Sequence, residues 1–248
     1  MNNKDTLKLL ISEELKGIIW KIVLDDSRLL MVIETRTPDR ETFFYVYDFA
    51  SERFLWRHEK LKSELSLVLH SCFDGKVYFQ SMQAGPVPEH TFILAYDAYT
   101  KALLFEKYTH NLEAVSEIGL VSFPGKILPK KLELLDLSNG NFVRSLSFSE
   151  LSELPFPAND IHLPDDHFGP TLWETYQQLR FKNYTVKAFY RPGTKDQDQV
   201  LELYDEKQLV LTDYLNQTIQ KLYQDTFFVW SGRLIYIRNK REIVSYLL

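Results

Sequence analysis

The sequence predicts an all-β fold: a single five-bladed β-propeller, spanning residues 1–248, built of four-stranded antiparallel blades. Three observations predict this class. A short polar turn ending in a basic residue recurs about every fifty residues, and a hairpin with an Asp at the end of its first strand recurs beside it. The last unit of this repeat lacks one strand, which the first residues of the chain resemble.

The repeated turn is followed each time by an apolar run. Its copies are Asp26-Ser27-Arg28-Leu29-Leu30, Asp74-Gly75-Lys76-Val77-Tyr78, Pro124-Gly125-Lys126-Ile127-Leu128, Ser231-Gly232-Arg233-Leu234-Ile235, and a degraded copy near Lys182-Asn183-Tyr184-Thr185-Val186. Basic positions 28, 76 and 126 are 48 and 50 residues apart, and position 233 follows 126 by 107, about twice that unit. Each unit leaves apolar surface that its neighbour covers, so the repeat favours one domain.

The second hairpin of each unit turns after Asp48, Asp97, Asp136 and Asp205. A carboxylate in this position accepts hydrogen bonds from backbone amides two residues on, so these residues are expected to close turns rather than to act on a substrate.

The strands expected in the first, second, fourth and fifth units are 18–24, 29–35, 42–47 and 53–58; 66–73, 76–82, 91–96 and 102–108; 184–190, 200–204 and 209–214; and 226–230, 234–237 and 242–246.

The fifth unit ends after three strands. Residues 5–13 resemble the outer hairpin arm of the second unit, residues 100–106, and have no preceding partner of their own. We therefore expect the N-terminal strand to complete the C-terminal blade, which closes the row of sheets into a ring.

One stretch departs from the repeat, an irregular insertion at about residues 149–183 with four of the ten prolines. Long insertions in compact domains are often functional. Candidate ligand-binding groups within it are two imidazoles and three carboxylates: Asp160, His162, Asp165, Asp166 and His167. These residue types could perform acid–base chemistry or coordinate a divalent ion. Their spacing matches no helical zinc pair or calcium loop, so an ordinary polar loop explains them better.

A capping box at residues 171–174 predicts a short helix through Leu179, whereas the repeat demands a strand there. Both alternatives remain open at this stage. The helix is the one favoured by the local sequence.

Composition restricts the function class. The net charge of −5 and a pI near 5.7 disfavour nucleic-acid binding. No apolar run is long enough for a signal peptide or a membrane span, so we expect a cytoplasmic protein that does not enter membranes. Its single cysteine, Cys72, agrees with a reducing compartment and is expected to be a buried, inert thiol within a strand.

The hairpins resemble the quinoprotein-like (PQQ-type) propeller repeat, in which Asp is followed by Thr and Gly, and by Trp eight positions after the Asp. The matching positions are Asp48 with Trp56, Asp97 with Thr100 and Phe105, and Asp136 with Gly140; Arg144 and Asp213 stand where the third and fourth aromatic residues belong. The resemblance implies a propeller. No Trp-flanked pocket signature or vicinal cysteine pair accompanies it, so no quinone or other cofactor is expected. The chain also looks like uncharacterised propeller-like proteins of similar length.

Catalytic signatures such as a phosphate loop or a nucleophile elbow do not occur. The sequence therefore favours a non-catalytic module that binds a protein or peptide through rim loops, with residues 85–88 and 192–198 as candidate loops. The alternative is a hydrolase or other enzyme acting on a small molecule or glycan at the central opening, with Asp160, Asp165 and Asp166 as its acids. Redox chemistry with a bound quinone is a third possibility.

Overall fold

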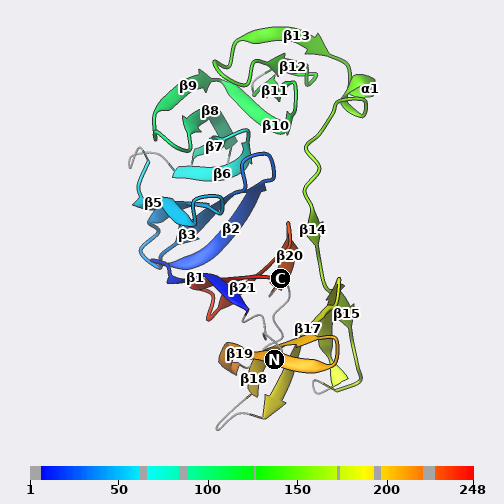
Figure 1. Ribbon diagram of the computed structural model, residues 1–248. Coiled ribbons are helices and arrows are strands. Elements are labelled where there is room, and N and C mark those ends of the chain that lie inside the picture. Colours follow the sequence, from blue (N-terminus) through cyan, green and yellow to red (C-terminus); the bar gives the residue numbers. More distant parts are fainter. Residues whose placement is uncertain are drawn as a thin grey trace. The chain divides into compact units, whose positions relative to one another are not determined.

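The computed structural model describes residues 7–61, 66–83, 89–125, 127–171, 174–192, 197–219 and 227–248. Its described strands form five sheets of four or five strands, every pair antiparallel (Figure 1). Their contacts divide into two compact units. We call Lys16–Asn159 the central unit, and Asp160–Leu248 together with the described residues up to Leu15 the terminal unit. The expected single domain stays a prediction.

The central unit holds three sheets in which the strands follow chain order. They are β2 (Ile18–Asp25), β3 (Leu30–Arg36), β4 (Thr42–Asp48) and β5 (Arg53–Glu59); β6 (Ser66–Phe73), β7 (Lys76–Gln83), β8 (Glu89–Asp97) and β9 (Leu103–Tyr108); and β10 (His110–Ser116), β11 (Gly119–Pro124), β12 (Leu132–Leu135) and β13 (Phe142–Leu146). In the first two sheets these bounds agree with the expected strands to within two residues.

The terminal unit holds two five-stranded sheets. One contains β15 (Asp165–His167), β16 (Tyr176–Phe181), β17 (Tyr184–Pro192), β18 (Gln197–Asp205) and β19 (Gln208–Ile219) in that order, and the other has the order β1 (Lys8–Glu14), β22 (Glu242–Leu247), β21 (Arg233–Arg238), β20 (Phe227–Trp230) and β14 (Ile161–His162). β1 pairs with β22, with Leu9 opposite Tyr246 and Ser12 opposite Val244. The expected addition of the N-terminal segment to the last sheet is confirmed, whereas closure of a five-bladed ring stays a prediction.

In each unit the basic turn is expected to join the first strand to the second, as it does in the first two sheets. The third copy is not such a hairpin, which corrects the sequence prediction. The first hairpin of the third sheet turns at Glu117 and Ile118, where Ser116 Oγ donates to the Gly119 carbonyl at 2.8 Å. A Cβ on Gly119 would lie 2.7 Å from the Leu134 side chain, so close packing requires glycine there. Residues 124–131 instead connect β11 to β12. The regular spacing of position 126 is therefore a coincidence of sequence.

The Asp-ended hairpins close as predicted in three of four cases. Asp97 Oδ1 accepts from the amides of Tyr99 and Thr100 at 3.0 and 2.7 Å, and Asp48 and Asp136 accept equivalent bonds. Asp205 was predicted wrongly, because its hairpin has only two turn residues and its carboxylate accepts instead from Asn183 of the neighbouring turn.

Asp97→Ala is expected to lower the free energy of unfolding by about 1–2 kcal/mol at neutral pH, because the turn loses its acceptor. Burial raises the pKa of Asp97, but the amide and hydroxyl of Thr100 act more strongly together, and the net pKa is lowered. A lowered folded-state pKa stabilises the fold above about pH 4 and loses that contribution as the pH falls through the folded value. Urea unfolding at neutral and acid pH measures the shrinking difference. The same effect from Asp39→Ala, an exposed residue, would contradict it.

Consecutive sheets of the central unit are joined by aromatic residues that dock on the next Asp turn. Trp56 Nε1 donates to the Ala98 carbonyl at 2.7 Å, and the Tyr78 hydroxyl donates to the Leu137 carbonyl at 3.1 Å. Ala98 and Leu137 each directly follow a turn Asp. Phe105 packs so closely against Gly140 that a Cβ there would lie 2.6 Å from its ring. The aromatic position of the repeat therefore acts between sheets.

The predicted insertion contains regular structure, which corrects the expectation of an irregular stretch. Ser147 and Glu150 cap the short helix α1 (Phe148–Leu151), and β14, β15 and β16 follow. The helix predicted through Leu179 is wrong: β16 lies there, paired with β17 along its whole length. Gln177 and Leu179 are buried at alternate positions, and this period of two is that of a strand. One bond of the capping box itself exists, since the Thr171 amide donates to Glu174 Oε2 at 3.2 Å.

Candidate functional site

The five candidate residues of the insertion lie on short strands of two different sheets. Asp160 directly precedes β14, which carries His162, and β15 carries Asp165, Asp166 and His167. The structure brings Asp160 and His162 together, with 3.1 Å between Oδ1 and Nε2 and both side chains about half exposed. The imidazole of His162 also lies against the ring of Phe181.

The residues of β15 make contacts within their own sheet. Asp166 accepts a 2.8 Å hydrogen bond from Gln177 Nε2, and His167 stacks on Tyr176 at 4.5 Å between ring centroids. Asp165 is exposed and lies opposite Gln178. Within the part of the chain that the structure describes, no group of three or more His, Cys, Asp or Glu side chains is placed to hold a metal ion. A ligand site at these five residues stays a prediction.

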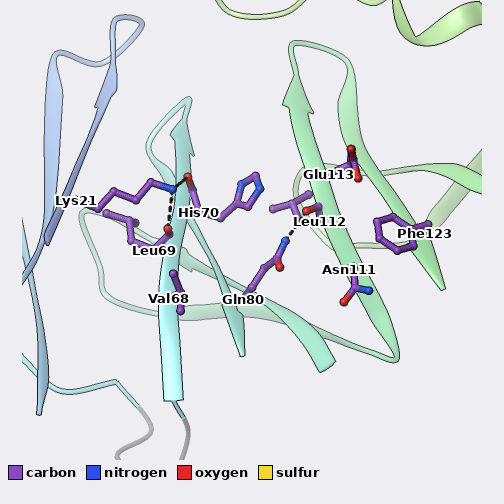
Figure 2. Close-up of a pocket in the computed structure, with 9 residues that line it drawn as sticks. All are labelled: Lys21, Val68, Leu69, His70, Gln80, Asn111, Leu112, Glu113 and Phe123. Carbon is purple, nitrogen blue, oxygen red and sulfur yellow. Dashed lines mark hydrogen bonds between the residues drawn. The ribbon is translucent and has the colours of Figure 1, made fainter. Parts of the chain in front are cut away.

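A different feature has the geometry of a binding site: a cavity of about 340 Å³ in the central unit (Figure 2). It lies where the first strands of three consecutive sheets come together, since β6 packs against both β2 and β10. The lining residues are Lys21 of β2; Val68, Leu69 and His70 of β6; Gln80 of β7; Asn111, Leu112 and Glu113 of β10; and Phe123 of β11.

The three first strands share a β-bulge that aims side chains at this region. The register shifts at Trp20 in β2, at His70 in β6 and at Glu113 in β10. A bulge inserts an extra residue, bends the strand and changes the direction of its side chains. His70 and Glu113 are the extra, unpaired residues of the bulges in β6 and β10, and both line the cavity.

Lys21 forms one wall of the cavity. Its Nζ donates to the carbonyls of Leu69 and His70, both at 3.0 Å, beside the bulge in β6 (Figure 2). Burial lowers the pKa of Lys21, and the nearby carboxylate of Glu34 opposes that shift.

The carboxylate of Glu34 is fully buried behind that wall. It accepts from the Leu69 amide at 2.8 Å and from the guanidinium of Arg36 at 2.7 Å. These contacts hold the Lys21 side of the cavity in one arrangement.

The other wall comes from β10 and β11. Glu113 forms an ion pair with Lys130 at 2.6 Å, and the Lys130 ammonium lies 3.9 Å from the centre of the Phe123 ring. Gln80 donates to the Leu112 carbonyl across the two sheets. Cationic, anionic, amide and aromatic groups thus surround one small space, which suits recognition of a small polar molecule.

Sequence reasoning did not identify any of these cavity residues. A signal was present at Lys21, which interrupts the apolar segment 18–24, and at its neighbour Glu34, which directly follows the apolar segment 29–33. Charged residues within otherwise apolar strands are buried with partners or line a site. The bulges that aim His70 and Glu113 leave no such mark in the sequence.

Cys72 is buried, as predicted, with 7% of its surface exposed. Its thiol faces Asp25, at 3.7 Å from Sγ to Oδ2, and Asp25 also accepts from the amide of Gly75 at 2.8 Å. Burial and the neighbouring carboxylate raise the pKa of Cys72 well above its ordinary value. Asp25, which the sequence analysis overlooked, thereby joins the turns of the first two sheets.

Cys72 is therefore expected to react with a disulfide reagent such as dithiobis(nitrobenzoate) at least ~100-fold more slowly in the folded protein than in guanidinium, because the reactive thiolate is disfavoured and shielded. Absorbance of the released thiolate measures both rates. An introduced exposed thiol, Ser51→Cys, is the control and should react rapidly in the folded protein. Equal rates for Cys72 in the folded and in the unfolded protein would contradict burial as the protecting factor.

Residues 24–105 match the model of a domain of unknown function (DUF4905). No curated protein matches the chain.

Two solved structures are similar to the chain at low identity. One is the β-propeller domain of the Trilobed protease from Pyrococcus furiosus, described as having an open velcro topology, with 12% identity, a TM-score of 0.37, and coverage of 99% of this chain and 75% of that chain. The other is BBS1N in complex with ARL6DN, with 11% identity, a TM-score of 0.24, and coverage of 100% and 65%. In the described residues, no helix has the length and hydropathy needed to cross a membrane.

Proposed function

We propose that this protein is a non-catalytic binding protein, built as a five-bladed propeller, that holds a small polar molecule in the cavity between its first strands. The main support for this proposal is the cavity itself, to which three consecutive sheets each contribute side chains. Bulges at matching places in β2, β6 and β10 support this reading, because bulges are over-represented next to binding sites.

The aromatic docking between sheets supports the propeller part of the proposal. At two consecutive interfaces of the central unit, the aromatic residue on the fourth strand of one sheet contacts the Asp turn of the next, with Trp56 on Ala98 and Phe105 on Gly140. A contact that repeats from sheet to sheet is expected where neighbouring units are related by a constant rotation. β1 in the last sheet is the closing strand that such a ring needs.

We also propose the rim loops 85–88 and 192–198 as a second binding region, for a protein or peptide. Residues 85–88 and 193–196 of these loops lie outside the described residues. The cavity has the stronger support because its lining groups are defined. A free cysteine is compatible with the cytoplasmic location that we propose.

The test is a thermal-shift screen of the purified protein against a panel of small polar metabolites, followed by mass spectrometry of any hit. A saturating ligand should raise the melting temperature by about 5–10 °C. Val68→Phe fills the cavity and should abolish the shift, while Val143→Phe, on the exposed edge strand β13, should preserve it. A panel without any hit, or a hit insensitive to Val68→Phe, would overturn the cavity as the site. Chemical conversion of the hit would overturn the non-catalytic assignment.

A further inference from the structure

The cavity presents a charged, unused hydrogen-bonding position on each of two opposite walls, and the buried Oδ1 of Asn111 is a further acceptor without a partner among the described residues. Lys21 Nζ carries three protons when charged and donates two of them, to the carbonyls of Leu69 and His70. Glu113 uses Oε2 for its ion pair with Lys130. Among the described residues, neither the third ammonium proton of Lys21 nor Glu113 Oε1 has a hydrogen-bond partner. One wall therefore offers a cationic donor and the other an anionic acceptor.

The two walls of the cavity differ in charge. Lys21 shares the buried carboxylate of Glu34 with the guanidinium of Arg36, whereas Glu113 pairs with Lys130 at 2.6 Å. A ligand that carries both charges gains charge-assisted hydrogen bonds at both walls, which are roughly twice as strong as neutral ones.

The remaining lining is mixed, since His70, Gln80 and Asn111 are polar and the other side chains are apolar. Val68, Leu112 and Phe123 lie between or beside the charged walls (Figure 2). A volume of about 340 Å³ is at the small end of the range for ligand pockets. The ligand that fits is small, dipolar and has a compact apolar group.

We infer that the cavity binds a free amino acid with an apolar side chain, whose carboxylate accepts from Lys21 and whose ammonium donates to Glu113. This inference rests on the proposed function and names its ligand class. The lowered pKa of Lys21 supports it, because the existing partners do not fully compensate the burial of that ammonium, and a ligand carboxylate would add compensation. The apolar side chain then packs on Leu112 and Phe123.

Calorimetry on the intact protein with four probes tests the ligand class. Leucine carries both charges, 3-methylbutylamine lacks the carboxylate, 4-methylpentanoate lacks the ammonium, and glucose is a neutral polyol. We expect leucine to bind at least tenfold more tightly than each of the other three. Comparable or tighter binding of any other probe would overturn the inference.

Two variants assign the two ends of the ligand. Lys21→Met should weaken leucine at least tenfold and leave 3-methylbutylamine unchanged, because the amine never used Lys21. Glu113→Gln should weaken leucine similarly and leave 4-methylpentanoate unchanged. Lys131→Met and Glu117→Gln, both at exposed positions, are the matched controls and should bind leucine as the natural protein does. A variant that weakens all probes equally would indicate a structural role and overturn the assignment.

The two proposals fail differently. If glucose or another panel compound binds and Val68→Phe abolishes its binding, the cavity is a ligand site and only the amino-acid inference is wrong. If no compound binds the natural protein, both proposals are wrong.

Discussion

Trp56→Ala should lower the free energy of unfolding by about 3–5 kcal/mol, the range typical of removing a fully buried large aromatic side chain. Trp56 has no exposed surface and packs against Phe79 and Tyr96 at centroid distances of 6.5 and 6.2 Å. It also joins two sheets, because its Nε1 donates to the Ala98 carbonyl at 2.7 Å. The substitution thus removes packing within the core and leaves a carbonyl between sheets without its donor.

Urea unfolding followed by circular dichroism measures the loss. Trp56→Phe keeps an aromatic ring but no donor, so it should cost less, about 1–3 kcal/mol. Trp20→Ala is the matched control, since Trp20 is 61% exposed and contacts mainly the guanidinium of Arg36; it should cost about 1 kcal/mol or less. Equal losses at positions 20 and 56 would show that the docking contact does not stabilise the fold.

The strands of the first two sheets could be predicted to within two residues because their signals are local. Period-two burial, a polar turn and an Asp at the strand end all act within a few residues of chain. The Asp97 turn is an example, since its acceptor and both amide donors lie within four residues. Such turns form from the sequence alone, whatever sheet they later join.

The first hairpin of the third sheet could not be predicted because its signals conflict. The apparent basic turn at residues 124–128 matched the period, but the true hairpin at Glu117 and Ile118 depends on the packing of Gly119 against Leu134 in a neighbouring strand. The helix predicted through Leu179 failed for the same reason. One bond of its capping box, from the Thr171 amide to Glu174, is local and present, yet pairing with β17 determines the conformation of Leu179.

The candidate cavity was beyond sequence reasoning because its residues meet only through sheet packing. Lys21 and Glu113 are 92 positions apart, and they face one space only when β2, β6 and β10 lie in consecutive sheets with bulges at matching heights. The sequence instead predicted a site around His162, where titratable residues are close together in the chain. These residues are neighbours in sequence, but they lie in two different sheets and their side chains do not converge on one point.

The last sheet gives the second large effect, through the strand that joins the two ends of the chain. Ile11→Asp should lower the free energy of unfolding by at least about 3 kcal/mol, because it places a carboxylate in an apolar site without a partner. Ile11 is 4% exposed on β1 and lies opposite Ser245 of β22. Loss of this strand would also separate Ser12 from Glu242 and Arg238, which it contacts at 2.8 and 3.0 Å.

Leu9→Asp is the control on the same strand, because Leu9 is 49% exposed and its substitution should cost less than about 1 kcal/mol. Hydrogen exchange distinguishes detachment from general destabilisation: in Ile11→Asp, the amides of β1 and β22 should lose protection before those of β17 and β18, the long central strands of the neighbouring sheet. If all four strands lose protection together, the terminal unit unfolds as one body and β1 is an integral core strand. If Ile11→Asp and Leu9→Asp are equally stable, the pairing of β1 with β22 contributes little to the fold, and the ring closure that we propose loses its main support.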